Sequence, residues 1–268
     1  MLMPTKTDWQ RAAADLLAGL DSWQMWMLLG LNDIKQRYKR SRLGQLWITM
    51  STGIFIAGIG IVYSYLFNRP IHEYLPYLSV NIVFWTFISG IVTDSTSVFT
   101  QSGHYFRQQA FPKTAFVMRI LVRQLLVLAH NVIIIAAVFF VFHVPFPLTA
   151  ICVLPGLAVL LLAAFLGAVT TGLLCTRFRD LPQIIQSLLQ VAFFLTPVMW
   201  HIEQLGERAN YIIDYNPFAI FLMLVTEPLH GRLPGWDTYG RAFAIIVAMA
   251  FVAAPLFARF RARIVYWL

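Results

Sequence analysis

Long apolar runs that carry almost no charge recur along the sequence and limit what the chain can fold into. A helix needs about 20 consecutive apolar residues to cross the hydrocarbon core of a bilayer, and the run from Leu43 to Phe67 meets that length without one charged side chain. Of the 268 residues, 59% are hydrophobic and 12% are charged, which exceeds what a soluble core of this size requires. We therefore predict an all-α integral membrane protein with six transmembrane helices. The spans are expected at about residues 43–67, 74–95, 124–144, 148–176, 184–200 and 242–258.

The basic residues indicate which ends of these spans face the cytoplasm. Sixteen of the twenty Lys and Arg residues fall in the N-terminal segment, the second and fourth links and the C-terminal tail. Cytoplasmic loops carry such an excess of positive charge, so both termini are expected inside. The same bias accounts for the net charge of +8, and nucleic acid is not expected as a partner. The chain is therefore expected to cross a membrane several times.

The N-terminal region, residues 1–34, is expected to be amphipathic. Trp9, Leu16 and Leu20 recur near helical spacing, with Arg11 and Asp15 elsewhere on the helical wheel. This pattern predicts a helix that lies in the membrane interface, or one that packs on the protein itself. Residues 35–268 are expected to form the six-span transmembrane domain.

A cluster of basic residues directly precedes the first span. Such clusters set the orientation of a span, and they also attract anionic lipid headgroups. Both roles are open for this one. Its members are Lys35, Arg37, Lys39, Arg40 and Arg42.

The link from Gly103 to Arg123 is basic and aromatic. It is expected to be either a docking element for a cytoplasmic partner or an interfacial helix on the inner leaflet. Asp94, the one acidic residue inside an expected span, is predicted to pair with a basic residue of this link.

The segment from Arg177 to Trp200 combines a basic turn with an apolar run that contains several amides. Polar amides are costly in a hydrocarbon environment unless they face protein or water. The amides therefore indicate either a pore wall or hydrogen bonds between packed helices. The following link, residues 201–238, has apolar stretches too short to cross, which are expected to be re-entrant or to lie at the outer face.

The sequence predicts neither a metal site nor a catalytic site. Cys152 and Cys175 lack the spacing of metal ligands. Asp94, His130 and His143 are expected at different depths, without a recognisable catalytic spacing. An intramembrane enzyme is therefore disfavoured.

Several motifs together resemble one family of membrane proteins. They are RYKRSRLGQLW before the first span, FPKTAFVMR after the second, RFRDLPQ leading into FFLTPVMW, and the Tyr-Asn-Pro-Phe sequence at Tyr215 to Phe218. From Asn32 onward the chain resembles the permease subunits of polysaccharide-exporting ABC transporters, in the O-antigen export branch of the type-2 exporters. The resemblance implies a location in the inner membrane of a bacterium, crossed several times, and the export of undecaprenyl-linked polysaccharide from the cytoplasm across it. Exporters of capsule or teichoic acid are close alternatives, and small-lipid or drug exporters share the fold.

The resemblance also implies a division of labour between subunits. This chain would form half of a homodimeric channel that works with two copies of an ABC ATPase. The sequence contains no G-x-x-x-x-G-K-[ST] phosphate loop, so ATP and Mg²⁺ are expected on the partner and no cofactor is expected in this chain. By position, the coupling contacts would come from the 103–113 loop and the RDLP turn, and residues 203–229 would match short outer gate helices. The coupling residues would be Tyr105, Phe106, Arg107, Phe111, Lys113, Arg179 and Asp180.

The channel of this family is formed largely by the first and fifth spans, which suggests roles for aromatic residues there. Sugars present C–H faces that can slide over aromatic rings, although aromatic residues near span ends also serve as interfacial anchors. The expected channel contacts are Tyr63, Phe193, Phe194, Trp200, Gln186 and Gln190. Arg37, Lys39 and Arg40 are expected to guide the pyrophosphate of the lipid-linked substrate.

Overall fold

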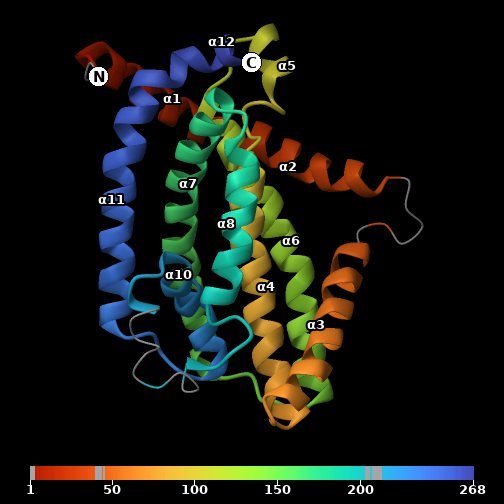
Figure 1. The fold of residues 1–268 in the computed structure, drawn as a ribbon. Coiled ribbons are helices and arrows are strands. Elements are labelled where there is room, and N and C mark those ends of the chain that lie inside the picture. The colour runs from red at the N-terminus through yellow and green to blue at the C-terminus, as the bar shows by residue number, and fades with distance from the viewer. Residues whose placement is uncertain (1–3, 40–43, 45, 203–205, 207–212) are drawn as a thin grey trace.

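The structure, a computed structural model, describes residues 4–39, 44, 46–202, 206 and 213–268. Throughout this part of the chain the only regular elements are helices (Figure 1). They are α1 (Lys6–Asp21), α2 (Trp23–Tyr38), α3 (Leu46–Leu66), α4 (Ile71–Ser95), α5 (Gly103–Gln108), α6 (Lys113–Val141), η1 (Leu148–Cys152), α7 (Val153–Arg177), α8 (Leu181–Leu195), α10 (Pro217–Thr226), η3 (Glu227–His230), α11 (Trp236–Phe260), η4 (Arg261–Arg263) and α12 (Ile264–Trp267).

Five helical segments of the described chain are long and apolar enough to cross a membrane. They are Leu46–Leu66, Ile71–Ser95, Lys113–Val141, Leu148–Arg177 and Trp236–Trp267. They correspond to all the expected spans except the fifth, with boundaries that differ by up to eleven residues. The all-helical membrane fold is confirmed for the described residues.

The expected fifth span at 184–200 is shorter than predicted. Helix α8 has 15 residues, which gives it a length of about 22 Å, less than the roughly 30 Å of the hydrocarbon core. It ends at Leu195 because Thr196, which precedes Pro197, adopts an extended conformation with ψ 141°. A sixth crossing by this helix therefore stays a prediction.

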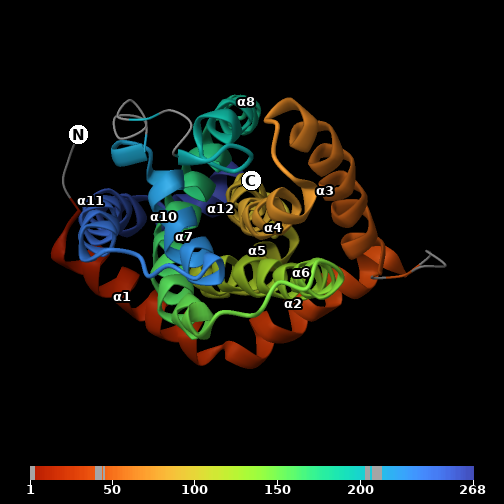
Figure 2. The same ribbon diagram turned by 90° about the horizontal axis from the view of Figure 1, so that it is seen from below.

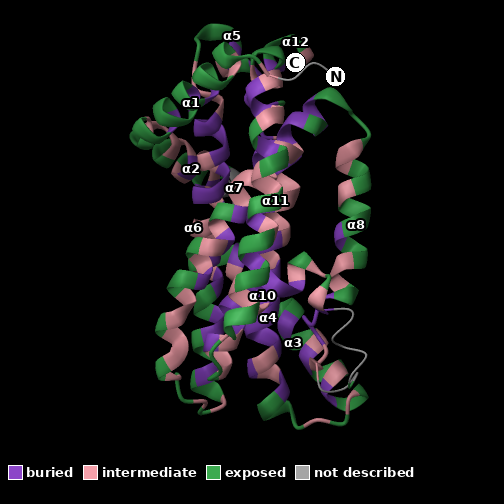
Figure 3. Ribbon diagram, turned by 90° about the vertical axis from the view of Figure 1, so that its left-hand side faces the viewer, coloured by how far each residue is buried: buried purple, intermediate pink, exposed green. Residues whose placement is uncertain are grey.

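Helix α4 forms the centre of the bundle. It packs against α3, α6, α7 and α10, and side chains on all sides of it are buried. Seen along the bundle, the other helices surround it (Figure 2), and buried residues are far more frequent in α4 than in α8 (Figure 3). Asn81, Ser79 and Ser95 are buried within it, each hydrogen-bonded to a carbonyl.

Helix α6 begins earlier than the sequence suggested. The third span was expected at 124–144, with residues 113–123 in a link, but the helix starts at Lys113. Arg119 is bidentate to Asp33 of α2, with Nε–Oδ2 and Nη2–Oδ1 distances of 2.7 and 2.5 Å. Arg123 lies 2.7 Å from Asp94 and 3.3 Å from Asp33. Acidic partners neutralise both guanidinium groups. The basic segment 113–123 therefore forms the first turns of a membrane helix and not a separate link.

The pairing of Asp94 with a downstream basic residue is confirmed, although Arg123 lies in a helix rather than a loop. Gln124 donates a further hydrogen bond to the same carboxylate. We name Asp33, Asp94, Arg119, Arg123 and Gln124 the inner charge cluster; it joins α2, α4 and α6.

The N-terminal region consists of two helices that meet at Ser22, and the expectation that it packs on the protein itself is confirmed. One face of α1 is buried against α6, where Gly19 lets Thr114 approach so closely that a Cβ would lie 2.1 Å from its Oγ1. Trp9, Leu17 and Leu20 are exposed on the remaining surface of α1. A position of this helix in the membrane interface stays a prediction.

Removing one member of the inner charge cluster should destabilise the protein strongly. Arg123→Leu leaves the half-buried Asp94 without its cation, and breaking a fully buried pair costs about 3–5 kcal/mol. We expect a lower melting temperature in detergent, and partial recovery in the double variant Arg123→Leu/Asp94→Leu. The exposed Arg107→Leu serves as control. Equal melting temperatures for Arg123→Leu and the control would show that the cluster contributes nothing.

Candidate functional site

An open groove of about 750 Å³ runs between α3, α4 and α8. Its wall carries amides and hydroxyls beside aromatic rings. The lining residues are Phe55, Ile82, Trp85, Thr86, Ser89, Thr93, Gln186, Leu189, Gln190, Phe193 and Phe194. The structure therefore brings together four of the six residues that the sequence suggested for a channel.

Helix α8 contributes one polar face to this groove. Gln186, Gln190 and Phe193 are spaced four and three residues apart, which places them on one side of a helix. Neither glutamine side chain hydrogen-bonds to any residue that the structure describes. On the other side, Leu188 is apolar and 61% exposed. Within this chain the amides thus do not join helices and instead face the groove.

An aromatic cluster occupies part of the groove wall. The ring of Trp85 lies 5.7 Å from that of Phe193 and 5.8 Å from that of Phe218, and Phe193 lies 5.4 Å from Phe194. Sequence reasoning missed Trp85. The sequence did offer a signal for a role of Trp85: it lies in the middle of an expected span, where an aromatic residue cannot serve as an interfacial anchor.

Tyr63 and Trp200 lie outside the groove. The Tyr63 ring packs against Phe67 at 5.4 Å. The Trp200 indole donates a hydrogen bond to the Phe194 carbonyl at 3.0 Å. Both side chains support the ends of helices in this structure.

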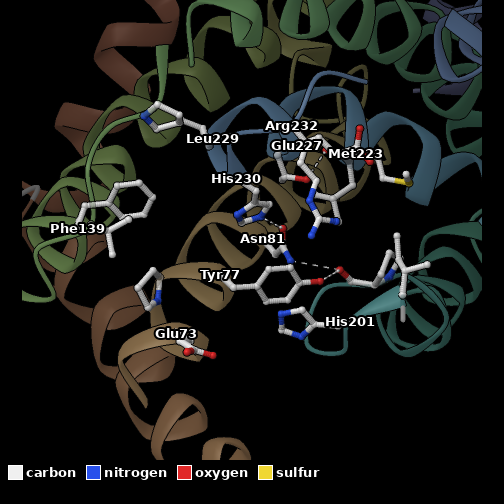
Figure 4. A pocket seen from close by; sticks show the side chains of 18 of the residues that line it. Glu73, Tyr77, Asn81, Phe139, His201, Met223, Glu227, Leu229, His230 and Arg232 are labelled. Carbon is white, nitrogen blue, oxygen red and sulfur yellow. Dashed lines mark hydrogen bonds between the residues drawn. The ribbon is translucent and has the colours of Figure 1, made fainter. Parts of the chain in front are cut away.

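The turn that follows α8 is fixed to α4. Three residues on one face of α4 donate hydrogen bonds to its carbonyls: Tyr74 to Met199 at 2.7 Å, Tyr77 to Trp200 at 2.9 Å, and Asn81 to Pro197 at 3.3 Å. We name this arrangement the outer anchor; Figure 4 shows Tyr77 and Asn81 pointing toward the turn. The sequence did not reveal it, because the acceptors are backbone groups.

A second cavity, which we name the outer pocket, lies beside the outer anchor. It has a volume of about 550 Å³ and lies between the first half of α4, the turn before η1, the turn after α8, and η3. The His201 ring stacks on Tyr77 at 3.8 Å and the His230 ring at 4.9 Å (Figure 4).

Burial controls the charge of two groups in the outer pocket. Asn81 uses its amide nitrogen for Pro197, so its Oδ1 accepts a hydrogen bond from His230 Nε2 at 3.2 Å. Burial, with His201 and Arg232 close by, lowers the pKa of His230 to about 4. Burial raises the pKa of Glu227, while nearby Arg232 opposes that change. At neutral pH His230 is uncharged.

The expected coupling residues lie at the end of the bundle that also holds both termini (Figure 1). Phe106 is buried against Phe116, with ring centroids 4.7 Å apart, so it supports the loop from within. Lys113 Nζ lies 4.4 Å from the Phe106 ring centroid and donates to the Phe111 carbonyl. The exposed residues are Arg107, Arg179 and Asp180, with Tyr105 and Phe111 half-buried.

Of the residues expected to guide a pyrophosphate, Lys39 is exposed at the end of α2. Arg40 and the side chain of Arg37 lie outside the described residues.

The fold and the groove define a helical, multi-pass membrane protein with a groove along its flank, lined by amides, hydroxyls and aromatic rings. Residues 24–229 match the ABC-2 type transporter family, and the chain belongs to that family of ABC transporter permeases. It is similar to an O-antigen export system permease protein RfbA of Klebsiella pneumoniae, with 22% identity over 71% of this chain and 74% of the relative. A protein of the same name from Myxococcus xanthus is 22% identical over 84% of this chain and 88% of its own length. The resemblance seen in the motifs is thus confirmed.

The pKa of His230 predicts how stability depends on pH. The ordinary pKa of 6.5 falls to about 4 in the fold. On acidification from about pH 7 to about pH 5, the unfolded state takes up a proton that the folded state refuses, so stability decreases. The melting temperature of the wild type should therefore decrease more over this range than that of His230→Gln. Identical decreases in the two proteins would contradict the assignment.

Proposed function

We propose that this chain forms the channel of an ATP-driven exporter that moves undecaprenyl-linked polysaccharide, of the O-antigen type, from the cytoplasm across the bacterial inner membrane. The observation that carries the proposal is the α3–α4–α8 groove, whose amides are free of protein partners among the described residues and lie beside aromatic rings. The names of the similar proteins support the choice of cargo.

The chemistry of the groove suits a hydroxyl-rich polymer. Aromatic rings offer flat apolar surfaces to the C–H faces of sugars, and the rings of Trp85 and Phe193 line the wall. The amides of Gln186 and Gln190 can exchange hydrogen bonds with successive hydroxyl groups. Weak, repeated contacts of this kind allow a chain to advance without being held at one position.

The open side of the groove supports a homodimer. Amides that faced lipid would remain without hydrogen bonds in the hydrocarbon core. Apolar side chains beside them are also uncovered, including Phe194 at 63% exposure. A second copy of the chain placed against α3 and α8 would close the groove into a channel.

Energy for transport would come from a separate ABC ATPase that binds ATP and Mg²⁺. Its docking surface would include Arg107 of α5, Phe111 in the link that follows, and the turn with Arg179 and Asp180. These segments lie at the same end of the bundle (Figure 1). Lys39, together with Arg37 and Arg40, would attract the pyrophosphate of the substrate.

Blocking the groove should stop export. In a strain whose own copy of this chain is deleted, Gln190→Trp should reduce surface polysaccharide about tenfold or more compared with the wild-type chain, because the indole would fill the path. Leu162→Trp, on an exposed part of α7 outside the groove, should export normally. Surface polysaccharide is measured on gels of whole-cell extracts. A deletion strain that still displays its polymer would refute the proposed function.

Changes on the docking surface should uncouple the ATPase. Arg107→Glu combined with Phe111→Ala should lower the amount of ATPase that purifies with the chain about tenfold, since a charge reversal and a lost apolar contact coincide. Trp236→Ala, at the opposite end of the bundle, should retain the partner. Undiminished co-purification of the double variant would exclude this surface.

A further inference from the structure

The outer pocket is separate from the groove and lies at the end of the bundle opposite α5 and both termini (Figures 1 and 4). Glu227, the first residue of η3, lines it together with Asn81, His230 and Arg232. Its volume of about 550 Å³ falls within the range of small-molecule sites, about 300–1,000 Å³.

The carboxylate of Glu227 has unused acceptor capacity. It makes no hydrogen bond and no ion pair with any residue in the described ranges. The group is half-buried, and this burial raises its pKa. A partly desolvated carboxylate with free lone pairs gains most from donors that enter the pocket.

The surroundings of Glu227 restrict the ligand. His230 is neutral, and the lining contains one arginine, Arg232, against two carboxylates, Glu73 at the rim and Glu227. The pocket therefore has no excess of positive charge to hold a phosphate or nucleotide. A purely apolar ligand would remove water from Glu227 and supply no donor. A neutral ligand rich in hydroxyl groups needs no excess of positive charge and supplies hydrogen-bond donors to Glu227.

Apolar surfaces complete the pocket in a way that suits sugar rings. Proline rings enter its wall from three different segments, and they offer C–H surfaces without backbone donors. They belong to Pro76 of α4, Pro145 and Pro147 before η1, and Pro197 after α8. Planar polar groups beside such surfaces match the alternating hydroxyl and C–H faces of a saccharide.

We propose that the outer pocket binds one or two units of a neutral saccharide, with Glu227 accepting hydrogen bonds from its hydroxyl groups. This inference rests on the proposed function, because the exported polymer would be its source. Only a segment that has already passed the membrane could reach the pocket. Binding there would hold the emerged part of the polymer beside the outer anchor and so oppose its return.

The test uses the purified full-length chain in detergent and a short oligosaccharide released by mild acid from the polymer of the strain that carries this chain. Saturation-transfer NMR and calorimetry should detect binding to the wild type. Glu227→Gln should weaken binding about tenfold, because a charge-assisted hydrogen bond is lost. Glu73→Gln is the matched control, since that carboxylate is 61% exposed at the rim and already lies near His72; its affinity should change less than about twofold.

A second variant keeps the test independent of the Glu227 substitution. Pro145→Trp, in the exposed turn that lines the pocket, should block the site and abolish binding. Unchanged affinity in both Glu227→Gln and Pro145→Trp would overturn the inference. The inference would also be overturned if the oligosaccharide did not bind the wild type while the deletion strain had lost its polymer. That outcome leaves the proposed function intact. A deletion strain that keeps its polymer would instead refute the proposed function itself.

Discussion

Charge neutralisation at the end of the bundle that holds both termini is the condition on which the rest of the fold depends. Arg119 and Arg123 enter the membrane-spanning part of α6, where an unpaired guanidinium group is costly. Asp33 comes from α2 and Asp94 from α4, so the two acids that satisfy these cations also fix three helices to one another. The N-terminal helices are therefore part of the core structure and not an appended membrane anchor.

Asp15 of α1 extends this principle to the start of α6. Its Oδ1 accepts a hydrogen bond from the backbone N–H of Thr114 at 3.1 Å, which satisfies one of the free donors at the helix start. Its other oxygen lies 2.7 Å from Arg261, at the far end of the chain. One carboxylate thus joins the N-terminal helix, the first turn of α6 and the C-terminal tail.

Elements with a strong periodic or compositional signal were predicted well, whereas contacts between distant residues were not. The apolar runs gave the long helices. The amides of the run that ends at Trp200, together with the family resemblance, pointed to Gln186, Gln190 and Phe193, which line one wall of the groove. The start of α6 was missed because Arg119 looks like a loop residue until Asp33 is placed beside it. The outer anchor was missed because tyrosine hydroxyls and backbone carbonyls leave no periodic pattern.

The contrast between α4 and α8 gives the groove one firm wall and one lightly held wall. Helix α4 is buried on all sides, fixed by the inner charge cluster at one end and by the outer anchor at the other. Helix α8 buries only Leu189 of its own residues. Elements with few buried contacts separate at the lowest free-energy cost. A polymer-sized opening between α4 and α8 would therefore require the loss of few contacts along α8. The hydrogen bonds from Tyr74 and Tyr77 would keep the turn after α8 in place beside the outer pocket.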